Sequence, residues 1–448
     1  MRRKIFRRWT ERLALLLLAL PLFAIAAPPA SPAGDVVDAA LVQAQKRQSP
    51  VLVDFHAPWC YSCYFMSTNV LVGEEWAAVN KRAVVVDVDV DTPEGAQRQQ
   101  QMHVRGLPTY VVLDASGNEL GRIVGERTRA EFYRRIGELL ARTESLEQLA
   151  ARVRNGSAPS IAAAREVLSA YYAREDVEGG LAWWTALPAP TQVKLEKDAQ
   201  LRLWTQRLRL LKASQFNEAH QCAALAPPVF SGDLGCERPN EVERVMTCTA
   251  ALSAGDRKRL LEPQKEMLAR LLYGRVFIAH PSCADARSAV LAEAQLDREL
   301  GYPKAEAAIL DTAITDARKR LGGDLKKDRN LADNLRVYLE RAAHPVELDA
   351  LYPKLIAAYP DDYVYPYRYA KMLAGQGHYA EALHYFERAA PKAYGVNRLS
   401  VAQGRAEALV KLGRVDEAKA VVADALKANG PWFPEEAAKV RAVVSPAG

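Results

Sequence analysis

The chain has 448 residues, of which 49% are hydrophobic and 25% charged, so it is long enough for two or more folded domains. Its formal net charge of +6 comes almost entirely from residues 1–26, which hold six basic residues and one acidic residue, whereas the rest of the chain holds 54 basic and 53 acidic residues. This nearly neutral remainder argues against nucleic acid or an anionic membrane surface as a partner.

The first element is an N-terminal targeting segment. Basic residues open the chain, an apolar run covers residues 13–26, and Ala24-Ile25-Ala26 has the small-X-small pattern of a cleavage site. These three parts predict a secretory signal peptide over residues 1–26, followed by a linker over residues 27–35. The run is shorter than the ~20 residues that span a bilayer, so we expect a periplasmic protein that is soluble after cleavage. An uncleaved N-terminal membrane anchor is the alternative.

A pair of cysteines follows the first predicted strand. The apolar run over residues 51–55 predicts a buried strand, and Trp59-Cys60-Tyr61-Ser62-Cys63 stands where this strand passes into a helix. Backbone N–H groups and the dipole at the helix start favour a thiolate at Cys60, and Cys63 lies one turn later, where it can resolve a mixed disulfide. This spacing predicts a redox-active dithiol. Zinc is the alternative, but it needs a second pair of ligands, and the nearest histidines are His56 and His103.

A second motif lies downstream of the cysteines. Gly106-Leu107-Pro108-Thr109 precedes the apolar residues 110–112, so a proline stands at the mouth of a predicted strand. An ordinary trans proline would disturb strand pairing there, whereas a cis proline at such a place is a deliberate structural feature. The sequence thus places a special proline in the same predicted domain as the dithiol.

Together these motifs resemble the thioredoxin fold family. The resemblance rests on residues 53–63, on residues 106–109 and on Arg122-Ile123-Val124-Gly125. It implies an α/β thioredoxin-like domain, which we assign to residues 36–145. The Leu-Pro-Thr triplet and the secretory context are most similar to the periplasmic C-terminal domain of the DsbD-type thiol:disulfide reductases.

The resemblance also implies roles for individual residues. Cys60 is the attacking cysteine, Cys63 is the resolving cysteine, and Asp54 is the buried carboxylate that helps to deprotonate the resolving thiol. The cis proline of the family falls on Pro108, which lines the substrate groove. The residues expected to bind the substrate are Trp59, Tyr61, Leu107, Pro108 and Thr109.

Four positions depart from the family pattern. The dipeptide between the cysteines is Tyr61-Ser62 instead of Gly-Pro, His56 replaces a tryptophan, and Asp87 stands where thioredoxin has a lysine. A charged imidazole at His56 would lower the thiol pKa, whereas simple packing of the ring is the alternative. These departures leave the direction of electron flow open.

The four remaining cysteines lie in one middle segment of the chain. An even number of cysteines in an exported protein indicates two structural disulfides, for which three connectivities exist. Sequence proximity favours Cys222–Cys236 together with Cys248–Cys283. Free buried thiols are one alternative, and a pair that relays electrons to or from the dithiol is another.

The rest of the chain has a different character. After residue 146 strand-like alternation ends, and Ala, Leu, Arg and Glu recur at helical spacing. Residues 376–389 recur as residues 412–425, in a pattern that resembles the tetratricopeptide repeat. We therefore expect an all-α helical-hairpin solenoid, with degenerate repeats over residues 146–345 and clearer repeats over residues 346–448. Such a solenoid offers a concave surface to a protein partner, and the alternative is a platform that only stabilises the redox domain.

These patterns predict an exported thiol–disulfide oxidoreductase that acts on protein cysteines, with reduction as the expected direction. Its redox group is the Cys60–Cys63 disulfide, so we expect no cofactor and no metal. Reduction in an oxidising compartment requires an electron donor, which we expect to be a membrane protein. An oxidase or isomerase is one alternative, and an interaction scaffold or assembly factor that acts through the helical repeats is another.

Overall fold

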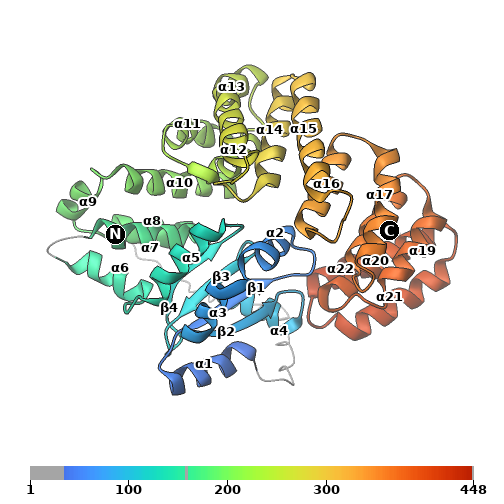
Figure 1. Cartoon of the computed structure of the whole chain (residues 1–448), viewed down its shortest axis with the longest axis horizontal. Helices are drawn as coiled ribbons and strands as arrows, with labels where there is room; N and C mark the ends of the chain where they lie inside the picture. The colour runs from blue at the N-terminus through green and yellow to red at the C-terminus, as the bar shows by residue number, and fades with distance from the viewer. Residues whose placement is uncertain (1–34, 157–159, 446–448) are drawn as a thin grey trace, which may run out of the picture. The chain divides into compact units, whose positions relative to one another are not determined.

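The computed structural model describes residues 35–156 and 160–445. The expected signal peptide over residues 1–26 lies outside these described residues. The described residues form one compact unit, in which a small α/β domain is followed by a long series of helices (Figure 1). The expected fold class, an α/β domain followed by an all-α region, is confirmed.

A four-stranded sheet with the strand order β2-β1-β3-β4 forms the centre of the α/β domain. β1 (Val51–His56) pairs in parallel with β2 (Val84–Asp89) and antiparallel with β3 (Thr109–Leu113). The edge strand β4 (Glu119–Val124) pairs antiparallel with β3. The parallel pair is connected through helices, as such a pair requires.

Both faces of the sheet are covered, because successive side chains of a strand point to opposite sides. Val51, Val53 and Phe55 of β1 share one core with the buried side chains of α1 (Val36–Arg47). Leu52 belongs to the second core, which α3 (Gly73–Arg82) and α5 (Arg129–Leu140) contribute to on the other face. This double coverage explains why residues 51–55 read as one continuous apolar run.

Two short helices follow the ends of β1 and β2. α2 (Tyr61–Phe65) begins directly after Cys60 and continues into the π-helical turn η1 (Met66–Val70), whose Met66 side chain is fully buried. α4 (Pro93–Gln101) follows β2 and is capped by the Thr92 hydroxyl, which accepts the Gly95 N–H at 3.0 Å.

The helices α6 to α22 make up what we call the helical region. Their bounds are α6 (Leu146–Asn155), α7 (Ile161–Ala173), α8 (Val177–Thr185), α9 (Ala189–Leu195), α10 (Ala199–Gln215), α11 (Ala219–Phe230), α12 (Arg238–Cys248), α13 (Ala254–Leu271), α14 (Ala286–Leu300), α15 (Pro303–Leu321), α16 (Arg329–Arg341), α17 (Pro345–Ala358), α18 (Val364–Gly375), α19 (Tyr379–Ala389), α20 (Gly395–Lys411), α21 (Val415–Asn429) and α22 (Pro434–Ala442). Within the described residues, no helix is both long and apolar enough to cross a bilayer.

The two repeated segments of the sequence form equivalent helices. Residues 376–389 contain α19 and residues 412–425 contain most of α21, and each of these helices packs against the helix before it. Phe386 and Val422, which occupy matching positions in the two segments, are both buried. The structure thus contains the expected helical hairpins, while their assignment to the tetratricopeptide class stays a prediction.

Two disulfides connect the middle of the helical region, Cys222–Cys248 and Cys236–Cys283. The pairing that sequence proximity favoured, Cys222–Cys236 with Cys248–Cys283, is therefore wrong. α11 and α12 pack against each other, which brings Cys222 near the start of α11 to Cys248 at the end of α12. A helix rises about 1.5 Å per residue, so α11 carries the chain away from Cys222 before it reaches Cys236.

Candidate functional site

The dithiol lies where β1 ends and α2 begins (Figure 1). Cys60 and Cys63 are joined in a disulfide. Cys60 is the N-cap residue of α2, and its Sγ accepts the Cys63 N–H at 3.1 Å. The exposed fraction of Cys60 is only 4%, and Cys63 is half-buried. In the reduced protein, the N–H groups and the dipole at this helix start favour a thiolate on Cys60.

Asp54 is a buried carboxyl group on β1. Its exposed fraction is 8%, and its Oδ1 atom has no hydrogen-bond partner among the described residues. Burial, and then the charge of Asp87 across the β1–β2 ladder, raises the pKa of Asp54 to about 8. A carboxyl group with such a pKa can take up and release a proton near neutral pH. The raised pKa of Asp54 is consistent with the predicted role of this residue as a proton acceptor.

The loop before β3 contains a cis peptide bond between Leu107 and Pro108. Pro108 and Thr109 are buried and Leu107 is half-buried. The Thr109 hydroxyl donates to the Gly106 carbonyl at 2.7 Å, and the Gly125 N–H donates to the Pro108 carbonyl at 2.8 Å. Because Thr109 pairs with Phe55 near the end of β1, this loop stands at the same end of the sheet as the dithiol. Substrate binding by these residues stays a prediction.

Two further residues that the sequence singled out flank the dithiol. Trp59 is 40% exposed, and its Nε1–H donates to Asp91 at 3.1 Å. Burial raises the pKa of Asp91. His56 is half-buried at the end of β1, and its carbonyl accepts the Val90 N–H at 3.0 Å. An effect of the His56 ring on the thiol stays a prediction.

The helical region contacts both neighbours of Cys60. The Arg368 guanidinium on α18 donates to the Trp59 carbonyl at 3.1 Å, and the Asn330 amide on α16 donates to the Tyr61 carbonyl at 2.9 Å. The Arg287 guanidinium on α14 lies over the Tyr61 ring, 3.7 Å from its centroid. Two helices that are distant in the sequence, α16 and α18, therefore hold the backbone on either side of Cys60, and α14 contacts the Tyr61 ring.

A buried aspartate fixes the arginines of this contact. Asp333 on α16 is fully buried and accepts hydrogen bonds from Arg287 at 2.7 Å, Arg336 at 2.8 Å and Arg368 at 2.7 Å. Burial alone would raise the pKa of this carboxyl, but the three guanidinium groups hold it well below its usual range. Such pairing is what allows a charge to persist in the interior.

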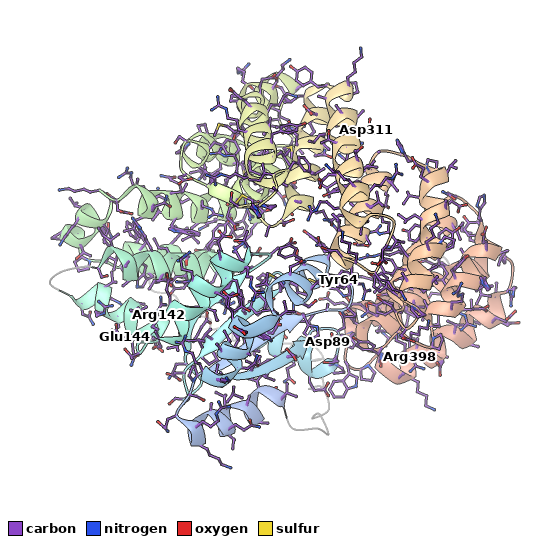
Figure 2. The ribbon with its side chains drawn as sticks, in the orientation of Figure 1. Tyr64, Asp89, Arg142, Glu144, Asp311 and Arg398 are labelled. Carbon is purple, nitrogen blue, oxygen red and sulfur yellow. A yellow bond between two sulfur atoms is a disulfide. The ribbon has the colours of Figure 1, made fainter. Side chains whose placement is uncertain are left out.

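Tyr64, which Figure 2 labels, extends the contact along α2. Its ring lies under the Arg329 guanidinium on α16, with 4.0 Å between the guanidinium carbon and the ring centroid. Burial raises the pKa of Tyr64, so its hydroxyl stays protonated. This hydroxyl donates to the Pro58 carbonyl, two residues before Cys60.

The start of α20 approaches the loop after β2. The Val396 N–H donates to the Asp91 carbonyl at 3.0 Å, and the Tyr394 hydroxyl donates to Asp89, which Figure 2 labels. Gly395 has a φ of +51°, and a Cβ atom at this position would lie 1.8 Å from the Asp91 carbonyl oxygen. Glycine is therefore required for this close approach of two backbones.

Buried polar groups surround the two residues between the cysteines. Ser62 and Glu126 each have an exposed fraction of 4%. The Tyr61 hydroxyl lies 3.2 Å from the Ser288 hydroxyl and donates to Asp285 at 3.5 Å. Burial, and then the charge of Asp285, holds the pKa of Glu126 well above its usual range.

Sequence reasoning missed the residues that contact Trp59 and Tyr61, on either side of Cys60, from elsewhere in the chain. Asn330, Arg368 and Asp285 are separated from their partners near the dithiol by 269, 309 and 224 residues. No local sequence motif indicates contacts between residues so far apart in the chain. Glu126 had one weak signal, a carboxylate placed directly after Gly125 of the family motif.

Comparison with known proteins supports the reading of the α/β domain. Residues 34–115 match a family model described as Thioredoxin-like. The thioredoxin-like protein HCF164 of the Arabidopsis thaliana chloroplast is 28% identical over 104 residues, which are 23% of this chain and 39% of that protein. The thiol:disulfide interchange protein DsbD of Cronobacter sakazakii is 34% identical over 95 residues, which are 20% of this chain and 16% of that protein. The chain thus spans well under half the length of these relatives.

A solution structure of a thioredoxin from Thermus thermophilus is 36% identical and covers 23% of this chain and 83% of that chain, with a TM-score of 0.22. The assignment of the domain rests on the family match, on the sheet order, and on the dithiol and cis proline at one end of the sheet. Residues 34–115 are therefore similar to the Thioredoxin-like family, and the α/β domain that contains this match is followed by an all-α region.

Proposed function

We propose that this protein is an exported thiol–disulfide oxidoreductase that reduces disulfides in other proteins. The observation that carries the proposal is the Cys60–Cys63 disulfide at a helix start, in a domain where Asp54 is buried with a pKa of about 8. The thioredoxin-like family match and a relative named thiol:disulfide interchange protein support the same chemistry.

In the first step, the Cys60 thiolate of the reduced protein attacks one sulfur of the substrate disulfide. A bond forms between Cys60 and the substrate, the disulfide of the substrate breaks, and one substrate thiolate leaves and takes up a proton. The helix start that stabilises the Cys60 thiolate lets this attack proceed near neutral pH. The loop at Leu107 and Pro108, at the same end of the sheet, is the proposed binding place for the substrate backbone.

In the second step, Cys63 gives its proton to Asp54 and attacks the Cys60 sulfur. The Cys60–Cys63 disulfide closes, the mixed disulfide breaks, and the second substrate thiolate leaves. Two electrons have then passed to the substrate, and the protein is in the oxidised form. An external dithiol must return two electrons before the next cycle.

The compartment and the electron donor are inferred from the N-terminal sequence and from the needs of the reaction. The N-terminal sequence pattern supports export, and reduction in an oxidising compartment needs a source of electrons on the other side of the membrane. We infer a membrane protein with a reactive dithiol as that source. The helical region, whose arginines and Asn330 already contact the dithiol segment, is the proposed docking surface for a protein partner.

Reduction of insulin with dithiothreitol as the electron donor tests this function. The wild-type protein should accelerate the reaction well above the rate with dithiothreitol alone, and Cys60→Ser should abolish the acceleration. A Cys222→Ala/Cys248→Ala variant is the matched control, because its disulfide lies in the core of the helical region and should not be needed for turnover. No acceleration, or acceleration that persists in Cys60→Ser, would contradict the proposal.

A further inference from the structure

The edge strand β4 leaves part of its backbone without a partner. It pairs with β3 on one side only, and the Gly125 N–H donates to the Pro108 carbonyl at 2.8 Å. Because residues of an antiparallel strand alternate in direction, Ile123 faces β3 as Gly125 does, and the N–H and C=O groups of Arg122 and Val124 point away from β3. These outward groups have no hydrogen-bond partner among the described residues.

The start of this edge is closed, whereas its end opens into a cavity. The Arg142 guanidinium, which Figure 2 labels, donates to the Leu120 carbonyl at 2.7 Å, and Arg174, directly after α7, pairs with Glu119 at 2.5 Å. Residues 121–127 line a cavity of about 780 Å³, whose other walls come from α5 and the helical region. Proteins usually cover the edge of a sheet, and a cavity of this size lies within the ~300–1,000 Å³ range of ligand pockets.

The cavity holds acidic side chains that the protein does not pair with cations. The arginines on its wall are all in ion pairs, namely Arg122, Arg127, Arg134, Arg135 and Arg207. The acidic residues on the same wall that form no ion pair among the described residues are Glu126, Glu131, Asp233 and Asp285. Glu126 has an exposed fraction of 4%, and its Oε2 atom has no hydrogen-bond partner among the described residues. A cation from a ligand would stabilise the charged form of this buried acid.

The cavity adjoins the end of the sheet that carries the dithiol. Phe55, Thr109 and Val124 lie in one row across β1, β3 and β4. Neighbouring strands are ~4.8 Å apart, so the end of β4 lies about 10 Å from the end of β1, with the cis-proline loop between them. A chain in extended conformation covers this span in about three residues, because each residue adds ~3.3 Å.

We propose that the edge of β4 and this cavity bind an extended, basic segment of the protein substrate, close in sequence to the disulfide that is reduced. The segment adds to the sheet as a further strand, its backbone pairs with the outward groups of Arg122 and Val124, and its lysine or arginine side chains meet Asp285 and Glu126. Its role as a substrate site rests on the proposed function of the dithiol.

The test of the charge preference is the affinity of the full-length protein for two fluorescent peptides without cysteine, measured by anisotropy. One peptide alternates valine with lysine, and the other alternates valine with glutamate. The lysine peptide should bind at least about tenfold more tightly, because like charges in the cavity disfavour the glutamate peptide. Asp285→Asn keeps the N-cap of α14 and should weaken binding of the lysine peptide at least about fivefold. Asp176→Asn is the matched control, because it changes the N-cap of α8 outside the cavity and should leave the affinity unchanged.

The test of strand addition is the loss of one outward N–H group. Val124→Pro removes this group at a position where a sheet edge tolerates proline, and should weaken binding of the lysine peptide about fivefold. Val124→Ala is the matched control, because it keeps the N–H group. N-methylation of alternate amides of the lysine peptide gives a second measurement if Val124→Pro does not fold. One of the two alternating patterns should abolish binding and the other should not, because successive amides of a strand point in opposite directions.

Equal affinities for the two peptides would overturn the inference, and so would equal weakening by Val124→Pro and Val124→Ala or by the two methylation patterns. Reduction of insulin by the same protein separates this inference from the proposed function. A protein that reduces insulin but does not prefer the lysine peptide would refute the inference alone. A protein that binds the lysine peptide but does not reduce insulin would refute the proposed function, and with it the role of the cavity as a substrate site.

Discussion

Replacing Asp54 with Asn should stabilise the oxidised protein, and increasingly so as the pH rises. Burial raises the pKa of Asp54 from 3.8 to about 8 in the folded protein, whereas the unfolded chain keeps the ordinary value. Between these two values the folded protein holds a proton that the unfolded chain has lost. The stability that this group contributes is thus fully present below about pH 4, falls as the pH rises, and levels off above about pH 8.

The expected size follows from the pKa difference. Each unit of difference corresponds to about 1.4 kcal/mol, so the difference in the free energy of unfolding between Asp54→Asn and wild type should grow by about 1.4 kcal/mol per pH unit between pH 5 and 7. At pH 7 the buried carboxyl group costs about 4 kcal/mol relative to a neutral residue of the same shape.

Hydrogen exchange of β1, read by mass spectrometry at pH 5, 6, 7 and 8, measures the opening free energy of the domain that holds Asp54. Comparison of variant with wild type at each pH removes the contributions of other acids. Asp87→Asn gives a second measurement: because the charge of Asp87 contributes to the raised pKa of Asp54, its replacement should lower that pKa and shorten the pH range over which the wild-type stability falls. A difference between Asp54→Asn and wild type that does not change with pH would refute this reasoning.

Three further outcomes are expected. Cys63→Ser should accumulate a mixed disulfide between Cys60 and the substrate on non-reducing gels, and its absence would show that Cys60 is not the attacking residue. Gly395→Ala should lower the free energy of unfolding by at least about 2 kcal/mol, because its Cβ would meet the Asp91 carbonyl oxygen at 1.8 Å. The control Gly413→Ala, at a φ of +76° in open space, should lower it by only about 1 kcal/mol. Equal losses for the two variants in denaturant unfolding would count against the clash. Replacing both cysteines of Cys236–Cys283, which are 47 residues apart, should lower the free energy of unfolding by about 4 kcal/mol. Replacing those of Cys222–Cys248, which are 26 residues apart, should lower it by about 3.5 kcal/mol. Unchanged calorimetric unfolding of both variants would contradict this expectation.

The features that the sequence predicted correctly are local. A strand, a helix start and two cysteines three residues apart all lie within residues 51–63, so their relation is set by short-range geometry. Pro108 is a local feature too, because it directly precedes β3. The helical hairpins over residues 376–425 are local as well, and their buried Phe386 and Val422 lie at matching positions of the two repeated segments. Asp54 was recognisable because a lone carboxylate interrupts an apolar run.

The features that the sequence did not predict depend on packing between distant elements. The disulfide pairing is set by the contact of α11 with α12, which proximity along the chain does not describe. The contacts of Asn330, Arg368 and Asp285 with the dithiol segment require the helical region to return to the α/β domain, and nothing in their local sequence encodes that return. Side chains that complete a site from another part of a chain become visible only when the fold is known.

The most direct test of the proposed function is the redox potential of the Cys60–Cys63 pair in the full-length protein, obtained by equilibration with glutathione or dithiothreitol and trapping of the Cys60 peptide. A reductase that an outside donor supplies with electrons should have a potential near that of thioredoxin, about −270 mV. A potential near that of the strong oxidant DsbA, about −120 mV, would contradict the reductive direction and would assign the protein to disulfide formation or isomerisation.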